Sequence, residues 1–312
     1  MLLIGDIGGT NARLALAEPG TTEPIEERYF PCAVYSAFEP ILAEYLAAMG
    51  TRISAGCLAV AGPVSNDGRK AKLTNLPWTL DADLLASDFE TGPLTLVNDF
   101  AGAALGVTVA PAESVVPLQH GTPLSNAPRL VVGAGTGLGM AILMPQGTAW
   151  RVLPSEGGHV GFSPLDDDQE RVWRALLAEH GRVTAERVIS GPGLTAIHRI
   201  LAGEELDAAE ISRRAIIDGE NVASRSVSVF LAAYGAFAGD MAMATMARGG
   251  IFLAGGIAAK LLPLMAESPF LKAFNAKAEH AELVRHMPVS VVTDPSLGLR
   301  GAAYFANCSA SP

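Results

Sequence analysis

A short pattern that occurs twice constrains this chain more than any other feature. Residues 4–10 (Ile-Gly-Asp-Ile-Gly-Gly-Thr) and 132–138 (Val-Gly-Ala-Gly-Thr-Gly-Leu) each lead from an apolar strand into a second apolar strand. Glycine allows a backbone to take positive φ or to approach a ligand closely, and successive unhindered N–H groups form an anion-binding concavity. The pattern predicts two hairpins, with turns at 7–10 and 133–139, that hold a polyphosphate from both sides. Two ordinary glycine hairpins are the alternative.

The two hairpins differ at one informative position. The first carries Asp6 where the second has Ala134, and Thr10 and Thr136 add a hydroxyl donor to each turn. A carboxylate can hold a hydrated magnesium ion, which usually keeps several of its waters. Because only one flank of a magnesium nucleotide needs the ion, this asymmetry predicts Mg²⁺ held by Asp6 through water.

Composition narrows the class of protein. The chain has 312 residues, of which 49% are hydrophobic and 17% charged, which favours two folded domains over disorder. A formal net charge of −10 argues against a nucleic-acid partner, which would need a basic face. The three cysteines are far apart and form no zinc pattern, so we expect no zinc and a reduced, cytoplasmic protein.

Membrane insertion is also not expected. The N-terminus enters a strand directly, without the basic and apolar regions of a signal peptide. The longest uncharged helical run, residues 226–239, is shorter than the ~20 residues that a membrane span requires.

Strands alternate with helical patterns along the chain, which predicts an α/β protein. The Gly/Pro/Ser-rich stretch 110–128 is expected to connect two domains. A long apolar helix is predicted over 222–247, in which Gly235 and Gly239 allow close helix packing. The strand 251–254 leads into Gly255-Gly256, on which an adenosine could lie because no side chain blocks it; a plain strand-to-helix turn is the alternative.

Polar residues with candidate catalytic roles follow the apolar strand 94–97. Asn98 and Asp99 stand where this strand ends and a helix is expected to begin. Ligands of open α/β sheets bind at the carboxyl ends of strands. A carboxylate there can take the proton of a hydroxyl that attacks a phosphoryl group. The alternative is that Asp99 only caps the next helix.

A second polar cluster is suited to a polyhydroxylated ligand. Glu156 and His159 flank two glycines, and their side chains can accept from and donate to hydroxyl groups. A metal site and a polar surface turn are the alternatives. Glu186 reads on its own as a first-turn acid of a helix, and Asn75 is a loop amide near a tryptophan.

Taken in order, these segments resemble the bacterial glucokinases, in the zinc-free branch of the actin/hexokinase/Hsp70-like ATPase superfamily. The resemblance covers nearly the whole chain, and it is carried by residues 5–13, 73–75, 97–100, 133–139, 156–159, 185–193 and 252–257. It implies a two-domain actin-like (ribonuclease H-like) fold with a cleft. The small domain would comprise residues 1–109 plus 297–312, and the larger domain would comprise residues 110–296.

The resemblance also implies an activity, phosphorylation of D-glucose by ATP as the first step of glycolysis, and a homodimer. Asp99 would be the general base. Residues expected to bind the sugar are Asn75, Asn98, Asp99, Glu156, His159 and Glu186. Residues expected to bind ATP are Gly5, Asp6, Ile7, Gly8, Gly9, Thr10, Gly133, Gly135, Thr136, Gly137, Gly255 and Gly256. Several relatives carry an acidic residue where this chain has Gly161, so sugar affinity could differ.

Other functions stay open at this point. Another hexose or amino-sugar kinase would bind the nucleotide with the same glycine turns but would contact its sugar with different side chains. A sugar-sensing regulator would need a DNA-binding helix-turn-helix and a basic face. A chaperone-like ATPase would need a peptide-binding domain.

Overall fold

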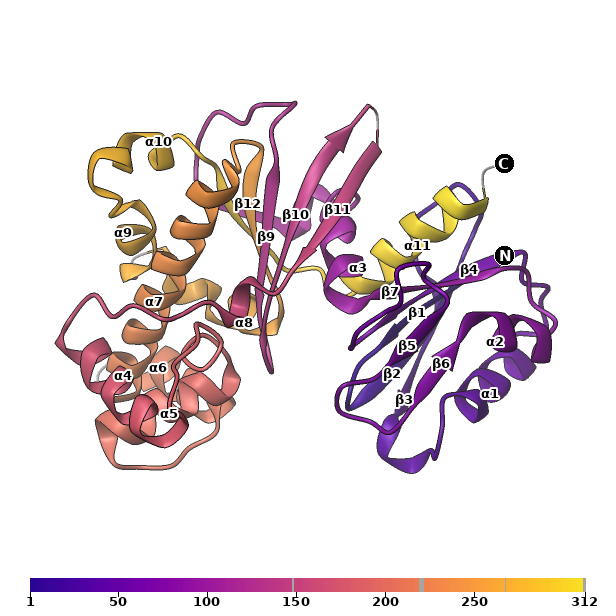
Figure 1. The fold of residues 1–312 in the computed structure, drawn as a ribbon, viewed down its shortest axis with the longest axis horizontal. Coiled ribbons are helices and arrows are strands. Elements are labelled where there is room, and N and C mark those ends of the chain that lie inside the picture. Colours follow the sequence, from indigo (N-terminus) through magenta and orange to yellow (C-terminus); the bar gives the residue numbers. More distant parts are fainter. Residues whose placement is uncertain (148, 219–221, 267, 311–312) are drawn as a thin grey trace. The chain divides into compact units, whose positions relative to one another are not determined.

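The computed structural model describes residues 1–147, 149–218, 222–266 and 268–310. The chain divides into two compact units. The first unit comprises Met1–Pro111 and Asp294–Pro312, and the second comprises Ala112–Thr293 (Figure 1). Each unit is built around its own mixed sheet.

The sheet of the first unit has the order β3-β2-β1-β4-β7. The strands β1 (Leu2–Ile7), β2 (Asn11–Ala17) and β3 (Ile25–Pro31) form an antiparallel meander. The strands β4 (Ala55–Val60) and β7 (Leu94–Asn98) continue the sheet parallel to β1. A separate small ribbon pairs β5 (Lys70–Lys72) with β6 (Thr79–Asp81).

Helices cover both faces of this sheet because β1 alternates its side chains between them. Leu3 and Ile7 pack with α1 (Glu39–Met49), whereas Leu2 and Ile4 pack with α11 (Leu297–Ala310). The same alternation sends Asp6 toward the α11 face. Two further helices are α2 (Ala82–Asp88), whose N-cap is Asp81, and α3 (Asp99–Gly106).

The sheet of the second unit repeats this strand order and adds one edge strand, as β11-β10-β9-β12-β13-β8. Its antiparallel meander is β9 (Arg129–Ala134), β10 (Leu138–Gln146) and β11 (Ala149–Ser155). The strands β12 (Gly250–Ala254) and β13 (Val289–Val292) run parallel to β9. The edge strand β8 (Val115–Gln119) is antiparallel to β13. The internal repeat therefore extends well beyond the two glycine hairpins.

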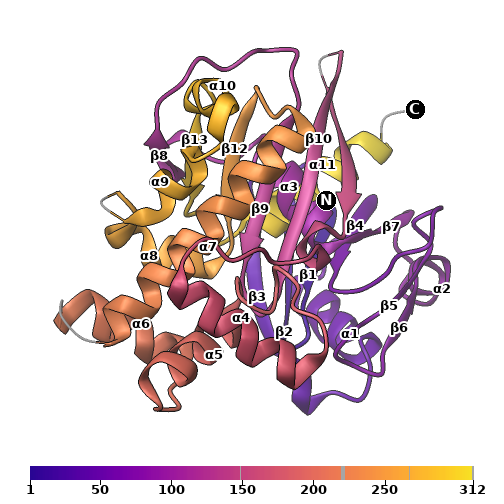
Figure 2. The ribbon, with the colours of Figure 1, turned by 60° about the vertical axis from the view of Figure 1, so that its left-hand side comes forward.

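The helices of the second unit enclose a large apolar core. They are α4 (Asp167–His180), α5 (Gly191–Ala202), α6 (Ala208–Asp218), α7 (Val222–Thr245), α8 (Gly256–Met265), α9 (Pro269–Asn275) and α10 (Ala281–Arg285). Figure 2 shows α7 against the sheet. Side chains at Gly235 and Gly239 would meet the α9 backbone at Phe270 and Phe274, which confirms the predicted close packing.

The helix α7 is longer than the uncharged run that the sequence suggested. By length and composition alone it could cross a membrane, but 67% of its apolar window is buried inside the protein. That burial is the behaviour of a core helix.

Two expectations about local structure were wrong, and a third held in part. The expected connector 110–128 contains the boundary between the two units, but it also contains β8, where Pro117 is tolerated because an edge strand leaves one side unpaired. The glycine turns are shorter than predicted, because Ile7 belongs to β1, Ala134 to β9 and Leu138 to β10. Glu186 lies in a turn before α5 rather than in the first turn of a helix.

Candidate functional site

The parallel strands of the first unit bring its predicted site residues to one edge of the sheet. The carboxyl ends of β1, β4 and β7 lie side by side, because these strands are parallel neighbours. Asp6 lies near the end of β1, and Asn98 and Asp99 stand where β7 passes into α3. This is the edge at which open α/β sheets bind ligands.

Asn98, not Asp99, caps helix α3. The Asn98 Oδ1 accepts hydrogen bonds from the amides of Phe100 (3.0 Å) and Ala101 (3.2 Å). Its Nδ2 donates to the carbonyl oxygen of Gly62 at 3.3 Å. The N-cap alternative for Asp99 is therefore wrong, and Asp99 occupies the first helical position, half-buried, with its Oδ1 accepting from the Phe100 amide at 2.8 Å.

The Asp6 carboxylate has the surroundings of a cation ligand. Burial raises the pKa of Asp6 to about 6; the Arg13 guanidinium opposes that shift, and the negative charge of Asp99 adds to it. Gly298 lies directly against Asp6, since a Cβ there would come within 2.7 Å of the Asp6 Oδ2. A partly buried carboxylate that also experiences the charge of a second carboxylate fits a divalent cation, which would offset the repulsion between them.

Asn75 lies against the first glycine turn. A Cβ added to Gly9 would meet the Asn75 Cβ at 2.9 Å, and Asn75 is exposed. The turn is closed by the Gly8 amide, which donates to the carbonyl of Asn11 at 3.0 Å. Its other amides, those of Gly9 and Thr10, are the candidate phosphate donors. Gly5 and Ile7 lie within the buried strand.

The second unit has a matching turn at the carboxyl end of β9. There the Gly135 amide donates to the carbonyl of Gly137 at 2.8 Å, and Thr136 is exposed. Gly133 is buried within β9. Beside the turn, Gly255 precedes α8 with φ of 88° and would bring a Cβ within 2.7 Å of the Ala134 carbonyl oxygen, so glycine is required there. Gly255 and Gly256 are both exposed.

The three residues predicted to bind a polyol from the second unit lie together. Glu156 precedes the 3₁₀ turn Gly157–His159 and His159 is its last residue; the His159 Nε2 is 3.7 Å from the Glu156 Oε2. The His159 Nδ1 is 3.9 Å from the Glu186 Oε1. Two carboxylates and an imidazole thus face one another, an arrangement that can accept from and donate to sugar hydroxyls.

A cavity of about 610 Å³ in the second unit connects the polyol cluster with the second turn. His159, Glu186 and Thr136 line it together with residues of α4 and α5, including Glu179 and Arg199. A phosphate-binding turn and hydroxyl-binding side chains therefore open into the same space.

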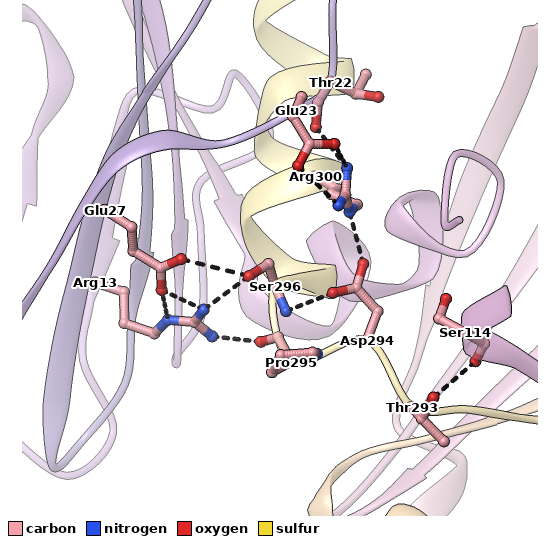
Figure 3. Close-up of polar contacts among 10 residues, drawn as sticks. All are labelled: Arg13, Thr22, Glu23, Glu27, Ser114, Thr293, Asp294, Pro295, Ser296 and Arg300. Atoms are coloured by element: carbon pink, nitrogen blue, oxygen red, sulfur yellow. Dashed lines mark hydrogen bonds and ion pairs between the residues drawn. The ribbon is translucent and has the colours of Figure 1, made fainter. Parts of the chain in front are cut away.

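Sequence reasoning missed Arg13, whose charge acts on Asp6. Arg13 lies opposite Asp6 in the β1–β2 ladder, and its side chain bonds Glu27 on β3. It also donates to the Pro295 carbonyl and the Ser296 hydroxyl just before α11 (Figure 3). Beside it, Arg300 pairs with Glu23 and Asp294. The only sequence signal for this pairing was the presence of an arginine at position 13 and two adjacent glutamates, Glu26 and Glu27, in the following segment.

Comparison with known sequences gives one consistent family. A family model described as Glucokinase matches residues 3–309. The glucokinase of Mesorhizobium japonicum is 37% identical, with coverage of 98% of this chain and 91% of the relative. The glucokinase of Nostoc punctiforme is 35% identical, with 98% of each covered.

Solved structures agree with the sequence match. A glucokinase from an Antarctic psychrotroph superposes with a TM-score of 0.86 at 31% identity, over 98% of each chain. A ROK family glucokinase from Streptomyces griseus, in complex with glucose and AMPPNP, has a TM-score of 0.70 at 19% identity, over 98% of this chain and 99% of that one. At that identity it supports a likeness of fold alone. The family match and the identities to curated relatives together establish that this chain belongs to the glucokinase family.

Proposed function

We propose that this chain transfers the γ-phosphoryl group of ATP to the 6-hydroxyl of D-glucose, the first step of glycolysis. The observation that carries the proposal is the family match across residues 3–309, combined with Asp99 at the carboxyl end of β7, on the same sheet edge as Asp6 and acting on it through its charge. The glycine turn of each unit would bind the phosphates, and the fold would be the two-domain actin-like (ribonuclease H-like) fold with the substrates in a cleft.

In this mechanism Asp99 is the general base. It accepts the proton of the 6-hydroxyl as the bond from that oxygen to the γ-phosphorus forms. The bond from the γ-phosphorus to the bridging oxygen breaks, and ADP leaves. Phosphoryl transfer passes through a loose transition state, so alignment and charge stabilisation supply most of the catalysis. The Asn98 cap fixes the start of α3 and with it the position of Asp99.

The other predicted residues divide between sugar and nucleotide. Asn75, Asn98, Glu156, His159 and Glu186 would contact glucose hydroxyls. The amides of Gly9, Thr10, Thr136 and Gly137 would contact phosphate oxygens, and Gly255-Gly256 would lie beneath the adenosine. Asp6 would hold Mg²⁺ through water, and the ion supplies neutralisation of phosphate charge when bound.

A coupled assay with magnesium ATP tests the proposal. Glucose should be the preferred acceptor over mannose, fructose, N-acetylglucosamine and N-acetylmannosamine. A site built to pair with hydroxyls rejects analogues that leave its polar groups unpaired. Turnover of an amino sugar with none of glucose would overturn the assignment. The homodimer and the cytoplasmic location stay predictions. Light scattering tests the homodimer.

A further inference from the structure

Three backbone segments of the second unit meet at Glu186. Its own amide donates to the carbonyl of Gly158 at 2.9 Å. Its Oε2 accepts from the amide of Leu138 at 2.9 Å, immediately after the glycine turn. Its Oε1 faces the His159 Nδ1 at 3.9 Å. One carboxylate oxygen is therefore committed to the turn, and the other is directed to the polyol cluster.

From this geometry we propose that Glu186 is a positioning residue for the turn 135–137 and couples nucleotide binding to sugar binding. The inference rests on the proposed function, because it takes the turn as a phosphate site and the polyol cluster as a sugar site. A charge-assisted hydrogen bond is about twice as strong as a neutral one. The bond from the Leu138 amide to Glu186 therefore fixes the end of the turn.

The glycines around Glu186 are explained by the same contact. A Cβ on Gly137 would lie 2.6 Å from the Glu186 Oε2, so a side chain there would displace the carboxylate. A Cβ on Gly158 would collide with the Leu138 carbonyl oxygen. The Gly191 amide, at the start of α5, also donates to the Gly135 carbonyl at 2.8 Å. These contacts hold the turn and the polyol cluster at a fixed separation.

Such a shared residue has a thermodynamic consequence. A group that supports both sites affects both when it is lost, so both affinities should fall. If it also couples the two ligands, each ligand changes the affinity for the other by the same factor. The test compares Glu186→Ala, which removes the acceptor, with Glu186→Gln, which keeps an amide oxygen for the Leu138 amide. Titration calorimetry measures the binding of magnesium ADP to the full chain without sugar.

We expect magnesium ADP to bind about tenfold more weakly to Glu186→Ala, the usual weight of one hydrogen bond to a charged group. Glu186→Gln should bind it about threefold more weakly than the unsubstituted chain, because a neutral acceptor restores about half of the free energy of the charge-assisted bond. The matched control is Glu282→Ala, which removes an exposed carboxylate of α10 that pairs with Arg285, does not line the cavity and leaves the Leu138 bond in place. It should leave the affinity for magnesium ADP unchanged.

A second pair of variants tests the coupling from the other side. Gly137→Ala should weaken glucose binding without nucleotide about tenfold, because the methyl group displaces Glu186. The matched control adds Gly137→Ala to Glu186→Ala, where no carboxylate remains to be displaced, so glucose binding should fall no further than in Glu186→Ala alone. Thermal melts establish that each variant folds.

Equal weakening of magnesium ADP binding in the Glu186 alanine and glutamine variants would overturn the inference, as would no weakening in either. Unchanged glucose affinity in Gly137→Ala would overturn it too. If the unsubstituted chain fails to phosphorylate glucose, the proposed function fails on that assay, and the comparison of magnesium ADP affinities still decides the role of Glu186.

Discussion

Replacing Asp99 with asparagine should separate catalysis from stability. The substitution keeps the shape of the side chain but removes its ability to take a proton. Positioned bases contribute about 10²–10⁴-fold to a reaction. We therefore expect kcat to fall at least about 100-fold in Asp99→Asn on the same grounds, while the affinity for glucose is largely kept.

The effect on stability follows from the cap of α3. Asn98 accepts from the amides of Phe100 and Ala101, and this cap is untouched by Asp99→Asn. The lost charge in the first turn is worth about 0.3–1 kcal/mol of unfolding free energy, and removing repulsion with Asp6 offsets part of that loss. The unfolding free energy should therefore change by less than about 1 kcal/mol.

The neighbouring substitution should lower both the unfolding free energy and the affinity for glucose. Asn98→Ala removes the cap, at a typical cost of about 1 kcal/mol, and also the bond to the Gly62 carbonyl. Urea unfolding, the coupled kinase assay and glucose calorimetry should be measured on both variants. If Asp99→Asn keeps kcat within about tenfold of the unsubstituted chain, less than the smallest contribution expected of a base, the assignment of Asp99 is refuted.

Three further predictions concern the sugar site, the core and pH. Glu156→Ala should weaken glucose binding in calorimetry, and an unchanged dissociation constant would count against its role. Gly235→Ala should lower the unfolding free energy in urea by about 1–3 kcal/mol, because the methyl group meets the Phe270 carbonyl. Burial raises the pKa of Glu27, but the hydrogen bonds from Arg13, Tyr29 and Ser296 and the charge of Arg13 together outweigh burial and leave the pKa below 4.5. The stability that this pair contributes is therefore lost as the pH falls from 4.5 through the lowered value, and Glu27→Gln should flatten the acid limb of a pH–stability curve.

The sequence allowed the buried strands to be predicted better than those at the edges of the sheets. Strands β1, β4, β9 and β12 are nearly continuous apolar runs, as expected of strands covered on both faces. Strand β3, at an edge, is mostly exposed and rich in charge, and β8 contains a proline. Their place depends on backbone pairing with a neighbour, which local composition does not encode.

The candidate site shows the same limit. Residue type and position at strand ends were enough to single out Asp6 and Asp99 from the sequence. The environment of Glu186 was not accessible in that way, because its partner Leu138 is 48 residues away in the chain. Likewise, the need for a residue without a side chain at Gly298 is visible only once the fold places α11 against Asp6. Contacts between segments remote in sequence need the fold before they can be inferred.

The difference between Asp6 and Ala134 follows from packing at equivalent strand ends. Ala134 is fully buried in the core of the second unit, and its carbonyl lies against Gly255. A carboxylate at position 134 would be buried without a partner, which would lower the unfolding free energy by several kcal/mol. Asp6 is only partly buried, with Gly298 leaving room beside it and Arg13 compensating its charge. Of these two strand ends, only the first can therefore carry an acid, and a single magnesium ion would be confined to that flank of the nucleotide.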